Sequence, residues 1–515
     1  MAARESRLAE VVAAFTLTTD LASGQPLEHG LRRTLLAIWL GAEAGLDDDR
    51  LRDAFYVALL GSAGCVLDSA AMARFLEDDI AFRANMFPLD MASPMVAARY
   101  FGGTVVRGRS PLRQAAKMIG LTTQSKAICR DVATGVGAIL DLGPHVRHAL
   151  GQCDEHWNGK SAVLGLKGEQ ISVHARLFLL AQDIEVFHRL GGEHAAIQVV
   201  QQRSGTYYDP QLATCFIKHA GELLARLQVA STWDAVLAAE PDPPRMLSAD
   251  EFDAVAQQVA SFVDMRSAYT VGHSAGVAAL AEAAAHHLGL GAEDALTLRR
   301  AGLLHDLGRA GVPVALWDKS APLTRSEREK LERHPALTEL ILARSSSLGQ
   351  LGTLAGLHHE RLDGSGYRGV GGSSLPITAR VLAVADAYQS KLEPRAYRMA
   401  LTPETAAVEV KRQVDIGRLD GDVARAVLAV GGHIDPVIAR AAPAGLTARE
   451  VEVLGLVVRG LSNRQVAESL VLAPKTVGHH IERIYEKTGV STRVGATLFA
   501  IEHGLVPPLA GQIRR

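Results

Sequence analysis

The stretch from His273 to Asp386 carries seven potential metal ligands, and its centre, residues 303–309, reads Leu-Leu-His-Asp-Leu-Gly-Arg. The seven ligands are His273, His305, Asp306, His334, His358, His359 and Asp386. Imidazole and carboxylate groups together suit divalent transition metals such as iron, manganese, zinc or cobalt. The stretch contains no cysteine, which excludes a structural zinc finger. An aspartate directly after a ligand histidine can bridge two ions, so we expect two divalent transition metals, with iron or manganese favoured.

The residues around these ligands have the apolar spacing of helices. This periodicity predicts helices over four ranges: Ala275–His287, Ala295–Leu307, Arg325–Ala343 and Ile377–Ser390. Between His359 and Leu375 the chain is rich in glycine, with glycines at 364, 366, 369, 371 and 372. Loops of that length inside a compact domain are usually functional. The sequence therefore predicts an all-α module with a loop over the metals.

The order of these ligands resembles the HD-GYP subgroup of the HD phosphohydrolases, over roughly residues 248 to 430. The resemblance implies metal-dependent hydrolysis of a phosphoester, with cyclic di-GMP as the substrate usual in the family. It assigns the bridging role to Asp306 and phosphate neutralisation to Arg309. It also implies a substrate loop that contains Asp363, Gly364, Gly366, Tyr367 and Arg368.

Two positions depart from the pattern of that family. Arg309 stands where the family has lysine, which keeps the charge but can grip phosphate with two N–H groups. Arg368 stands where the family has proline, which frees the backbone of the loop and adds a cation. Both changes leave the identity of the substrate open.

The composition indicates an ordinary globular protein. The 515 residues are enough for two to four domains, 48% of them are hydrophobic, and the formal net charge is −2. The N-terminus has no signal-peptide pattern, and no apolar run is long enough to cross a membrane. The four cysteines lack paired spacing, which fits a reducing compartment. We therefore expect a cytoplasmic protein without a membrane partner.

The N-terminal half repeats features of the metal-ligand stretch. Asp20 and His29 stand 244 positions before Asp264 and His273, and segment 154–159 lies against segment 359–364 with a spacing of 205. Only His29 of the seven ligands persists; Gly61-Ser62 replaces His305-Asp306, Cys153-Asp154 replaces His358-His359, and Gln182 replaces Asp386. The pattern predicts a degenerate HD-like domain over residues 1–240. It serves either as a scaffold for dimerisation or as a pocket that binds a signal without cleaving it.

Two linkers divide the chain. Residues 240–244 read Glu-Pro-Asp-Pro-Pro, and each proline disfavours helix. Ser248 and Glu251 then form a capping pattern that opens a new helix. The second linker runs from Gly431 to Pro443. We therefore expect the metal-dependent domain over residues 246–432 and a further domain over residues 444–508.

The last segment contains the start and stop signals of four helices. Thr447 with Glu450, and Ser462 with Gln465, are capping boxes. Pro474 suits the first turn of a third helix and Gly489 its end, while Ser491 could cap a fourth. Over its whole length the segment resembles the helix-turn-helix domain of LuxR-type regulators.

That resemblance implies double-stranded DNA as a partner and a homodimer as the binding form. The residues expected to meet DNA are Arg464, Lys475, Thr476, Gly478, His479, His480 and Arg483, while Val477, Ile481 and Ile484 keep core spacing. Nine basic and six acidic side chains give residues 444–515 a local charge of +3. Such an excess favours contact with phosphate.

These observations support two hypotheses. In the first, the chain is a transcription regulator whose second module hydrolyses a phosphoester, with a cyclic dinucleotide among the candidates. In the second, the module senses a nucleotide or a metal without turnover. Seven intact ligands favour hydrolysis, whereas Arg309 and Arg368 favour a changed substrate or lost turnover.

Overall fold

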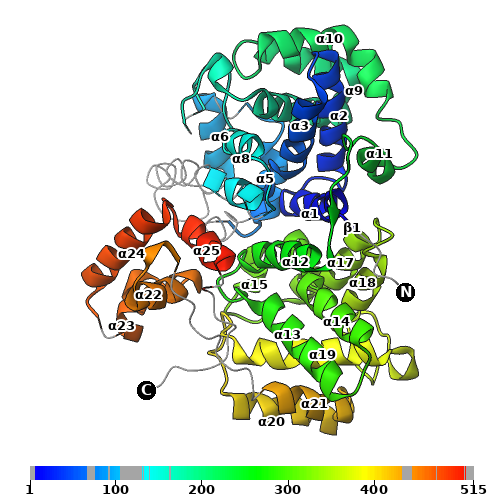
Figure 1. Cartoon of the computed structure of the whole chain (residues 1–515), viewed down its shortest axis with the longest axis vertical. Coiled ribbons are helices and arrows are strands. Elements are labelled where there is room, and N and C mark those ends of the chain that lie inside the picture. Colours follow the sequence, from blue (N-terminus) through cyan, green and yellow to red (C-terminus); the bar gives the residue numbers. More distant parts are fainter. Residues whose placement is uncertain are drawn as a thin grey trace. The chain divides into compact units, whose positions relative to one another are not determined.

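The computed structural model of this chain describes residues 6–66, 76–90, 93–104, 130–131, 133–138, 140–161, 164–431, 443–470, 472–503 and 505. The described residues divide into two compact units, 1–249 and 250–515. Both are built almost entirely of helices (Figure 1). The predicted all-α fold is confirmed. The predicted linker at 431–443 falls largely outside the described residues.

In the first unit, two short strands pair antiparallel and join its ends: β1 (Ser6–Arg7) and β2 (Met246–Leu247). Its described α-helices are α1 (Leu8–Ala22), α2 (His29–Glu43), α3 (Asp48–Leu60), α5 (Asp79–Met86), α6 (Pro94–Thr104), α8 (Pro144–Leu150), α9 (Val173–Arg203), α10 (Pro210–Ala225) and α11 (Thr232–Ala238). The helices α1, α2, α3 and α9 pack together. Their shared core is mostly apolar, but it also encloses ten polar or charged side chains, among them Asp20, His29, Arg33 and Glu185.

The second unit begins with helices that surround the predicted ligands. They are α12 (Ala249–Asp264), α13 (His273–His287), α14 (Ala292–Leu304), α15 (Val314–Trp317), α16 (Arg325–Leu331), α17 (His334–Leu342), α18 (Gly349–Ala355), α19 (Ile377–Leu392), α20 (Pro403–Asp415) and α21 (Gly421–Gly431). The central helix α13 packs against α14, α19 and α21. Most of its buried residues are small (alanine, glycine or serine), which lets neighbouring helices approach closely.

The helix predicted over Arg325–Ala343 is wrong as a single element. The structure has two helices there, α16 and α17, with a break before His334. Pro335 occupies the first turn of α17, where its missing N–H costs no hydrogen bond. The same proline could not continue α16 without losing a backbone bond and clashing with the preceding turn. The break turns His334 toward the interior, where it is fully buried.

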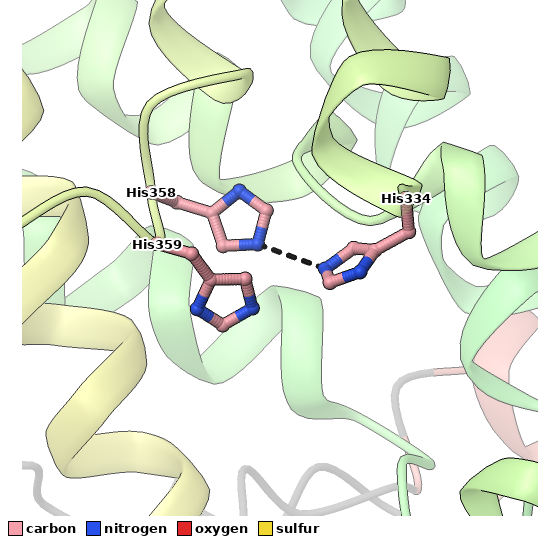
Figure 2. Close-up of side chains that lie close together, drawn as sticks. All are labelled: His334, His358 and His359. Atoms are coloured by element: carbon pink, nitrogen blue, oxygen red, sulfur yellow. Dashed lines mark hydrogen bonds between the residues drawn. The ribbon is translucent and has the colours of Figure 1, made fainter. Parts of the chain in front are cut away.

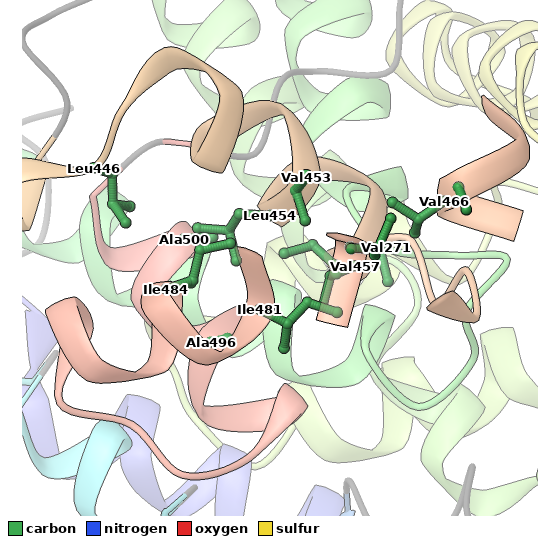
Figure 3. Close-up of a cluster of buried hydrophobic side chains, with 13 residues drawn as sticks. Val271, Leu446, Val453, Leu454, Val457, Val466, Ile481, Ile484, Ala496 and Ala500 are labelled. Atoms are coloured by element: carbon green, nitrogen blue, oxygen red, sulfur yellow. The ribbon is translucent and has the colours of Figure 1, made fainter. Parts of the chain in front are cut away.

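The last part of the second unit is a bundle of four helices: α22 (Ala448–Val458), α23 (Asn463–Leu470), α24 (Pro474–Thr488) and α25 (Arg493–Glu502). All four contribute to one apolar cluster, which includes Val457, Val466, Ile484 and Ala496 (Figure 3). Val271, from the loop just before α13, joins the same cluster. The periodicity that predicted these helices therefore also identified their core.

The caps of these four helices follow the sequence with one correction. Thr447 and Glu450 form a complete capping box, and Pro474 begins α24. Gly489 ends α24 in the left-handed conformation, with φ at 70°. The cap of α25 is Thr492, whose side chain accepts from the Gly495 N–H, and not Ser491.

None of the helices in the part of the chain that the structure describes is both long and apolar enough to cross a lipid bilayer.

Candidate metal centre and DNA-binding surface

The turn before α13 fixes the position of His273. Gly272 adopts a left-handed conformation with φ at 81°, which costs glycine nothing because it has no Cβ. The buried carboxylate of Asp264 accepts from the Ser274 N–H and from its hydroxyl, both at 2.8 Å. It thus satisfies a backbone donor that has no partner within the first turn. The His273 ring is held in the interior with no exposed surface.

The pair His305–Asp306 follows α14 and is locked against α17. A Cβ on Gly308 would stand 2.0 Å from the His334 carbonyl oxygen, so only glycine fits there. The Thr338 hydroxyl accepts from the Gly308 N–H at 2.9 Å and donates to the His305 carbonyl at 2.8 Å. The glycine of the His-Asp-Leu-Gly-Arg motif therefore allows Asp306 to lie beside His334.

Asp306 lies at the centre of the ligand cluster. Its Oδ2 atom is 3.0 Å from His305 Nε2 and 3.4 Å from His273 Nε2. Its Oδ1 atom is 3.4 Å from His334 Nε2 and 3.6 Å from His358 Nε2. Each oxygen of this carboxylate therefore faces a different pair of imidazoles, which is the geometry that a bridging ligand needs.

Asp386 and His359 complete the set. Asp386 Oδ1 is 3.2 Å from His273 Nε2, and Asp386 Oδ2 is 3.7 Å from His359 Nδ1. The structure thus brings all seven predicted ligands into one cluster. Two subsets each have their ligand atoms within 4.8 Å of one another: His273, His305 and Asp306, and, drawn in Figure 2, His334, His358 and His359.

The backbone sets the tautomer of three of these histidines. The Nδ1 atoms of His305, His334 and His358 lie 2.6 to 2.7 Å from the carbonyl oxygens three residues earlier. A carbonyl only accepts, so each Nδ1 carries the proton and each Nε2 offers a lone pair to the centre. Holding the outer nitrogen in this way is a regular feature of metal-ligating histidines.

The atoms that face the centre of the cluster are acceptors without a donor in the described part of the chain, so a cation is needed to pair with them. His334 Nε2 and His358 Nε2 are 3.2 Å apart, although neither has a proton to give (Figure 2). The Nε2 atoms of His273 and His305 and both oxygens of Asp306 are buried without a hydrogen-bond partner among the described residues. Buried polar atoms are costly unless they are paired or coordinate a metal. The donor set therefore fits divalent metal ions.

The electrostatics of the cluster favour the metal-binding forms of Asp306, His358 and His359. Burial raises the pKa of Asp306, but the charge of the Arg309 guanidinium outweighs burial and holds that pKa well below its usual range. Burial lowers the pKa of His358 and of His359 well below the ordinary value. An ionised carboxylate and neutral imidazoles are the forms that bind metals.

His273 is the exception, because a second carboxylate faces it. Burial alone would lower its pKa, yet the neighbouring carboxylates of Glu393 and Asp386 raise the pKa to about 10. Glu393 is fully buried and lies 3.0 Å from His273 Nδ1. It therefore orients the ring from its outer side, as a second carboxylate behind a ligand histidine does.

Arg309 lies at the edge of the cluster. Its Nε atom is 2.8 Å from Asp306 Oδ2, and its guanidinium lies over the Trp317 ring at 4.6 Å. The side chain is 12% exposed, so it reaches from the ligands toward the surface. This cation could meet an anionic group that enters the site.

The glycine-rich loop is tied down around a buried carboxylate. Glu360 accepts from the backbone N–H groups of Arg368 (2.8 Å) and Val370 (2.7 Å). The Tyr367 ring lies 4.4 Å from the His359 ring, which places the loop against the ligands. The Arg368 guanidinium does not point to them; it pairs with Glu339 of α17. A three-residue 3-10 turn, Gly372–Ser374, lies within this loop.

The surface predicted to meet DNA is open in the four-helix bundle. Arg464, Lys475, Thr476, His479 and Arg483 are exposed, and Gly478 and His480 are half-buried. Val477, Ile481 and Ile484 lie in the core, on the opposite face of α24. The sequence therefore separated the two faces of this helix correctly.

Comparison with known protein families matches both parts of the second unit. Residues 257–423 match the HD domain, and residues 444–500 match the bacterial regulatory proteins of the luxR family. The chain joins an HD domain to a LuxR-type domain. The resemblances stated from the sequence are thereby confirmed, and the LuxR-type match spans α22, α23 and α24 and most of α25.

Curated relatives extend the likeness beyond the HD domain. The 3'3'-cGAMP-specific phosphodiesterase 3 of Vibrio cholerae serotype O1 is 29% identical over 415 residues, which cover 78% of this chain and 89% of the relative. The cyclic di-GMP phosphodiesterase response regulator RpfG of Xanthomonas campestris pv. campestris is 38% identical over 125 residues, 24% of this chain and 33% of that protein. The HD domain is thus phosphodiesterase-like, and it is fused to a DNA-binding domain of the LuxR type.

A solved structure shows the same fold. A crystal structure of a cyclic GMP-AMP-specific phosphodiesterase of V. cholerae superposes with a TM-score of 0.57 and 24% identity. The match covers 84% of this chain and 99% of the other.

Several residues of the HD site were not found from the sequence. Glu393 supports His273, Glu360 organises the loop, and Trp317 packs against both Arg309 and His334. A signal for Glu393 was present, because it stands seven residues after Asp386, directly after the end of α19. Trp317 had no such signal, since its contacts depend on the tertiary fold.

Proposed function

We propose that this protein is a DNA-binding regulator whose HD domain hydrolyses a phosphodiester bond of a cyclic dinucleotide. The observation that carries the proposal is the central carboxylate of Asp306, whose two oxygens face separate pairs of buried imidazoles. Such an arrangement suits two divalent metal ions, and iron or manganese fits the mixed nitrogen and oxygen ligands.

The proposed mechanism assigns a role to each group in the site. Two bound metal ions would activate a water molecule and polarise the phosphoryl group. Asp306 would be a ligand between the two pairs of imidazoles, and Glu393 would keep the His273 ring in place. Arg309, at the edge of the cluster, would neutralise a phosphate oxygen as charge develops there. Tyr367, against His359, would shield the reacting centre from bulk water.

The names of the relatives support a cyclic dinucleotide as the substrate class. Three are named as specific for 3'3'-cGAMP, and others are named as cyclic di-GMP phosphodiesterases. One of the relatives named for 3'3'-cGAMP matches most of this chain, so we propose 3'3'-cGAMP as the first substrate to test. Arg309 and Arg368 distinguish this site from the motif of cyclic di-GMP hydrolases.

The test is turnover by the metal-loaded full chain. The chain would be incubated with 3'3'-cGAMP, cyclic di-GMP and cyclic di-AMP, and the linear product would be followed by chromatography. We expect linearisation of at least one of these compounds, and its loss in Asp306→Asn. If every compound stays intact although the protein carries its full metal complement, hydrolysis of cyclic dinucleotides is excluded.

A second candidate function is sensing without turnover. The observation that favours it is the 2.8 Å contact of Arg309 Nε with Asp306 Oδ2, which directs a cation at the central carboxylate. In that case the chain would bind a cyclic dinucleotide and return it unchanged. Calorimetric binding together with an intact ligand after prolonged incubation would select this function over hydrolysis.

We propose that the chain has three domains, over residues 1–240, 246–432 and 444–508. We also propose that it binds duplex DNA as a homodimer. Helix-turn-helix domains usually bind as dimers to paired half-sites. The exposed face of α24 carries Lys475 and His479. In electrophoretic shift assays, Lys475→Ala should weaken binding to all sequences alike if it contacts phosphate. A change at His479 should instead alter sequence preference.

A further inference from the structure

Helices of the N-terminal unit repeat those of the HD domain at a constant spacing. The first and last residues of α2 and α13 are 244 positions apart, and so are those of α3 and α14. The buried contacts repeat as well. Asp20 accepts from the Gly30 N–H at 3.0 Å, as Asp264 accepts from Ser274 at 2.8 Å. His29 Nδ1 contacts a buried carboxylate, that of Glu185, as His273 Nδ1 contacts Glu393.

The centre of the N-terminal unit differs, because neutral groups replace the two aspartates. Ser62 stands 244 positions before Asp306, and Gln182 stands 204 positions before Asp386. A serine hydroxyl and an amide are poor ligands for a transition metal. They are good hydrogen-bond partners for a donor that carries its own positive charge.

Such a donor occupies this centre. The Arg33 guanidinium donates to the Ser62 hydroxyl at 2.6 Å, to the Gln182 side-chain carbonyl at 3.3 Å, and to the Ala58 carbonyl at 2.7 and 3.1 Å. Its carbon Cζ lies 4.5 Å from the centre of the Phe178 ring. The side chain has no exposed surface, so this is a cation enclosed by the unit.

The same helical position in the HD domain shows what the fold itself requires. Val277 corresponds to Arg33, one turn after the shared histidine, and it is also fully buried. An apolar residue therefore packs there when aspartates and metal ligands supply the polar centre. A buried arginine costs several kcal/mol of desolvation unless partners compensate it. Here the hydrogen bonds to Ser62, Gln182 and Ala58, together with the Phe178 ring, provide that compensation.

We propose that the Arg33 guanidinium takes the place of the metal ions in the N-terminal unit. The unit would then be an HD-type fold with an internal cation, held together without a metal and closed to one. Arg33, Ser62 and Gln182 would act as a matched set: the two neutral side chains accept hydrogen bonds where their counterparts in the HD domain supply negative charge. This proposal is independent of catalysis in the HD domain.

The test is unfolding of this unit in the full chain. Three of the four tryptophans, Trp39, Trp157 and Trp233, belong to it, so in a Trp317→Phe background fluorescence reports this unit alone. We expect Arg33→Ala to raise the unfolded population by about a hundredfold, because it leaves buried polar groups without their partner. Millimolar methylguanidinium should restore part of the lost stability by refilling the site.

The matched control is Leu35→Ala, which opens a cavity on the same fully buried stretch of α2. Methylguanidinium should not rescue this variant, since no hydrogen-bond acceptors await a cation there. Equal rescue of both variants, or none of a folded Arg33→Ala, would overturn the proposal.

Two further variants cover the case in which Arg33→Ala does not fold. Arg33→Lys keeps the charge, whereas Arg33→Met keeps the length and removes the charge. We expect Arg33→Lys to yield more folded protein than Arg33→Met and to have a higher unfolding midpoint. If methionine serves as well as lysine, the cation is not needed and the proposal fails.

A last measurement addresses the metal directly. In an Asp306→Ala background, which disables the HD site, added manganese should leave the unfolding midpoint of the N-terminal unit unchanged. A ligand that binds only the folded form would raise that midpoint. A rise would show that the unit takes up a metal and would contradict the proposal.

Discussion

At the scale of single residues, the seven ligands differ in what their loss should do. Asp306 alone faces both imidazole pairs, so its removal should affect both halves of the site. We expect the combined change His305→Ala and Asp306→Ala to lower the metal content from about two ions per chain to near zero. Elemental analysis of purified protein measures this directly.

The matched control for metal content is His29→Ala. His29 has the position of His273 in the N-terminal repeat and pairs with Glu185. Ser62 and Gln182 stand there at the positions of Asp306 and Asp386. Its loss should leave the metal content unchanged, whatever it does to stability. Equal metal in the double variant and the parent would contradict the assignment of the HD site.

Arg309 is the second residue with a specific expectation. If it neutralises a phosphate oxygen in the transition state, Arg309→Ala should lower kcat by about a hundredfold, the usual effect of losing one such donor. Arg309→Lys should retain part of the rate, because it keeps the charge but not the two-pronged geometry. Steady-state kinetics with the substrate found by the turnover test would separate kcat from KM. A rate unchanged in Arg309→Ala would remove this residue from the mechanism.

The sequence identified the metal ligands but missed residues that hold the site in place. Each of the seven belongs to a local motif, so its type and neighbours were visible in the chain. Glu393 and Trp317 act through contacts that form only when distant helices pack. Arg368 was predicted to face the substrate, and its pairing with Glu339 could not be foreseen because it joins the loop to α17.

At the scale of secondary-structure elements, the start of α22 links a cap to the core of the LuxR-type domain. The Glu450 carboxylate accepts from the Thr447 N–H and from Lys487 of α24, both at 2.7 Å. Burial raises the pKa of Glu450, but hydrogen bonds from Lys487 and Thr447 outweigh it and lower the pKa to about 2. One carboxylate thus caps α22 and ties it to α24.

This contact gives the LuxR-type domain a defined pH response. Because the pKa is lower in the folded state, the contribution is present above the ordinary pKa of 4.5 and is lost as the pH falls toward about 2. Glu450→Gln should cost about 1 kcal/mol at neutral pH and little near pH 2 to 3. Hydrogen exchange of peptides from α22 and α24 measures it, with the exposed Glu452→Gln as control. A cost that does not change with pH would show that the cap, and not the charge, matters.

Helix boundaries followed from the sequence where a cap or a proline marks them. The starts of α22 and α24 were predicted correctly because Thr447 and Pro474 act within one turn of chain. The break between α16 and α17 was missed, since the periodicity continues across it. The choice of Thr492 over Ser491 as cap depends on backbone geometry that composition does not encode.

At the scale of the whole molecule, one loop connects the metal ligands to the LuxR-type domain. Glu393, which holds His273, lies 2.9 Å from Arg395, and Arg395 donates to the Tyr269 carbonyl at 2.7 Å. Two residues further on, Val271 packs into the apolar cluster of the LuxR-type helices. A change at the ligands therefore has a continuous path of contacts to the DNA-binding domain.

We expect occupancy of the HD site by metal and cyclic dinucleotide to change the affinity for DNA. The ligand can do so only if it binds one arrangement of the two domains better than another, and typical coupling energies are about 1–3 kcal/mol, or roughly 5- to 150-fold in affinity. A high-affinity duplex would first be selected from random sequences. Its affinity would then be measured at fixed salt with the nucleotide present and absent, using a hydrolysis-resistant phosphorothioate analogue if the parent consumes the ligand.

Val271→Ala tests the path itself. It should leave metal content and nucleotide binding intact but reduce the response of DNA affinity, whereas Val408→Ala, at an exposed position of α20, should reduce nothing. Linkage supplies an independent check, because DNA must change the affinity for the nucleotide by the same factor. DNA affinities that are identical with and without the nucleotide would mean that the HD site and the DNA-binding domain are not coupled. If the response is undiminished in Val271→Ala, the two sites are coupled, but not through Val271.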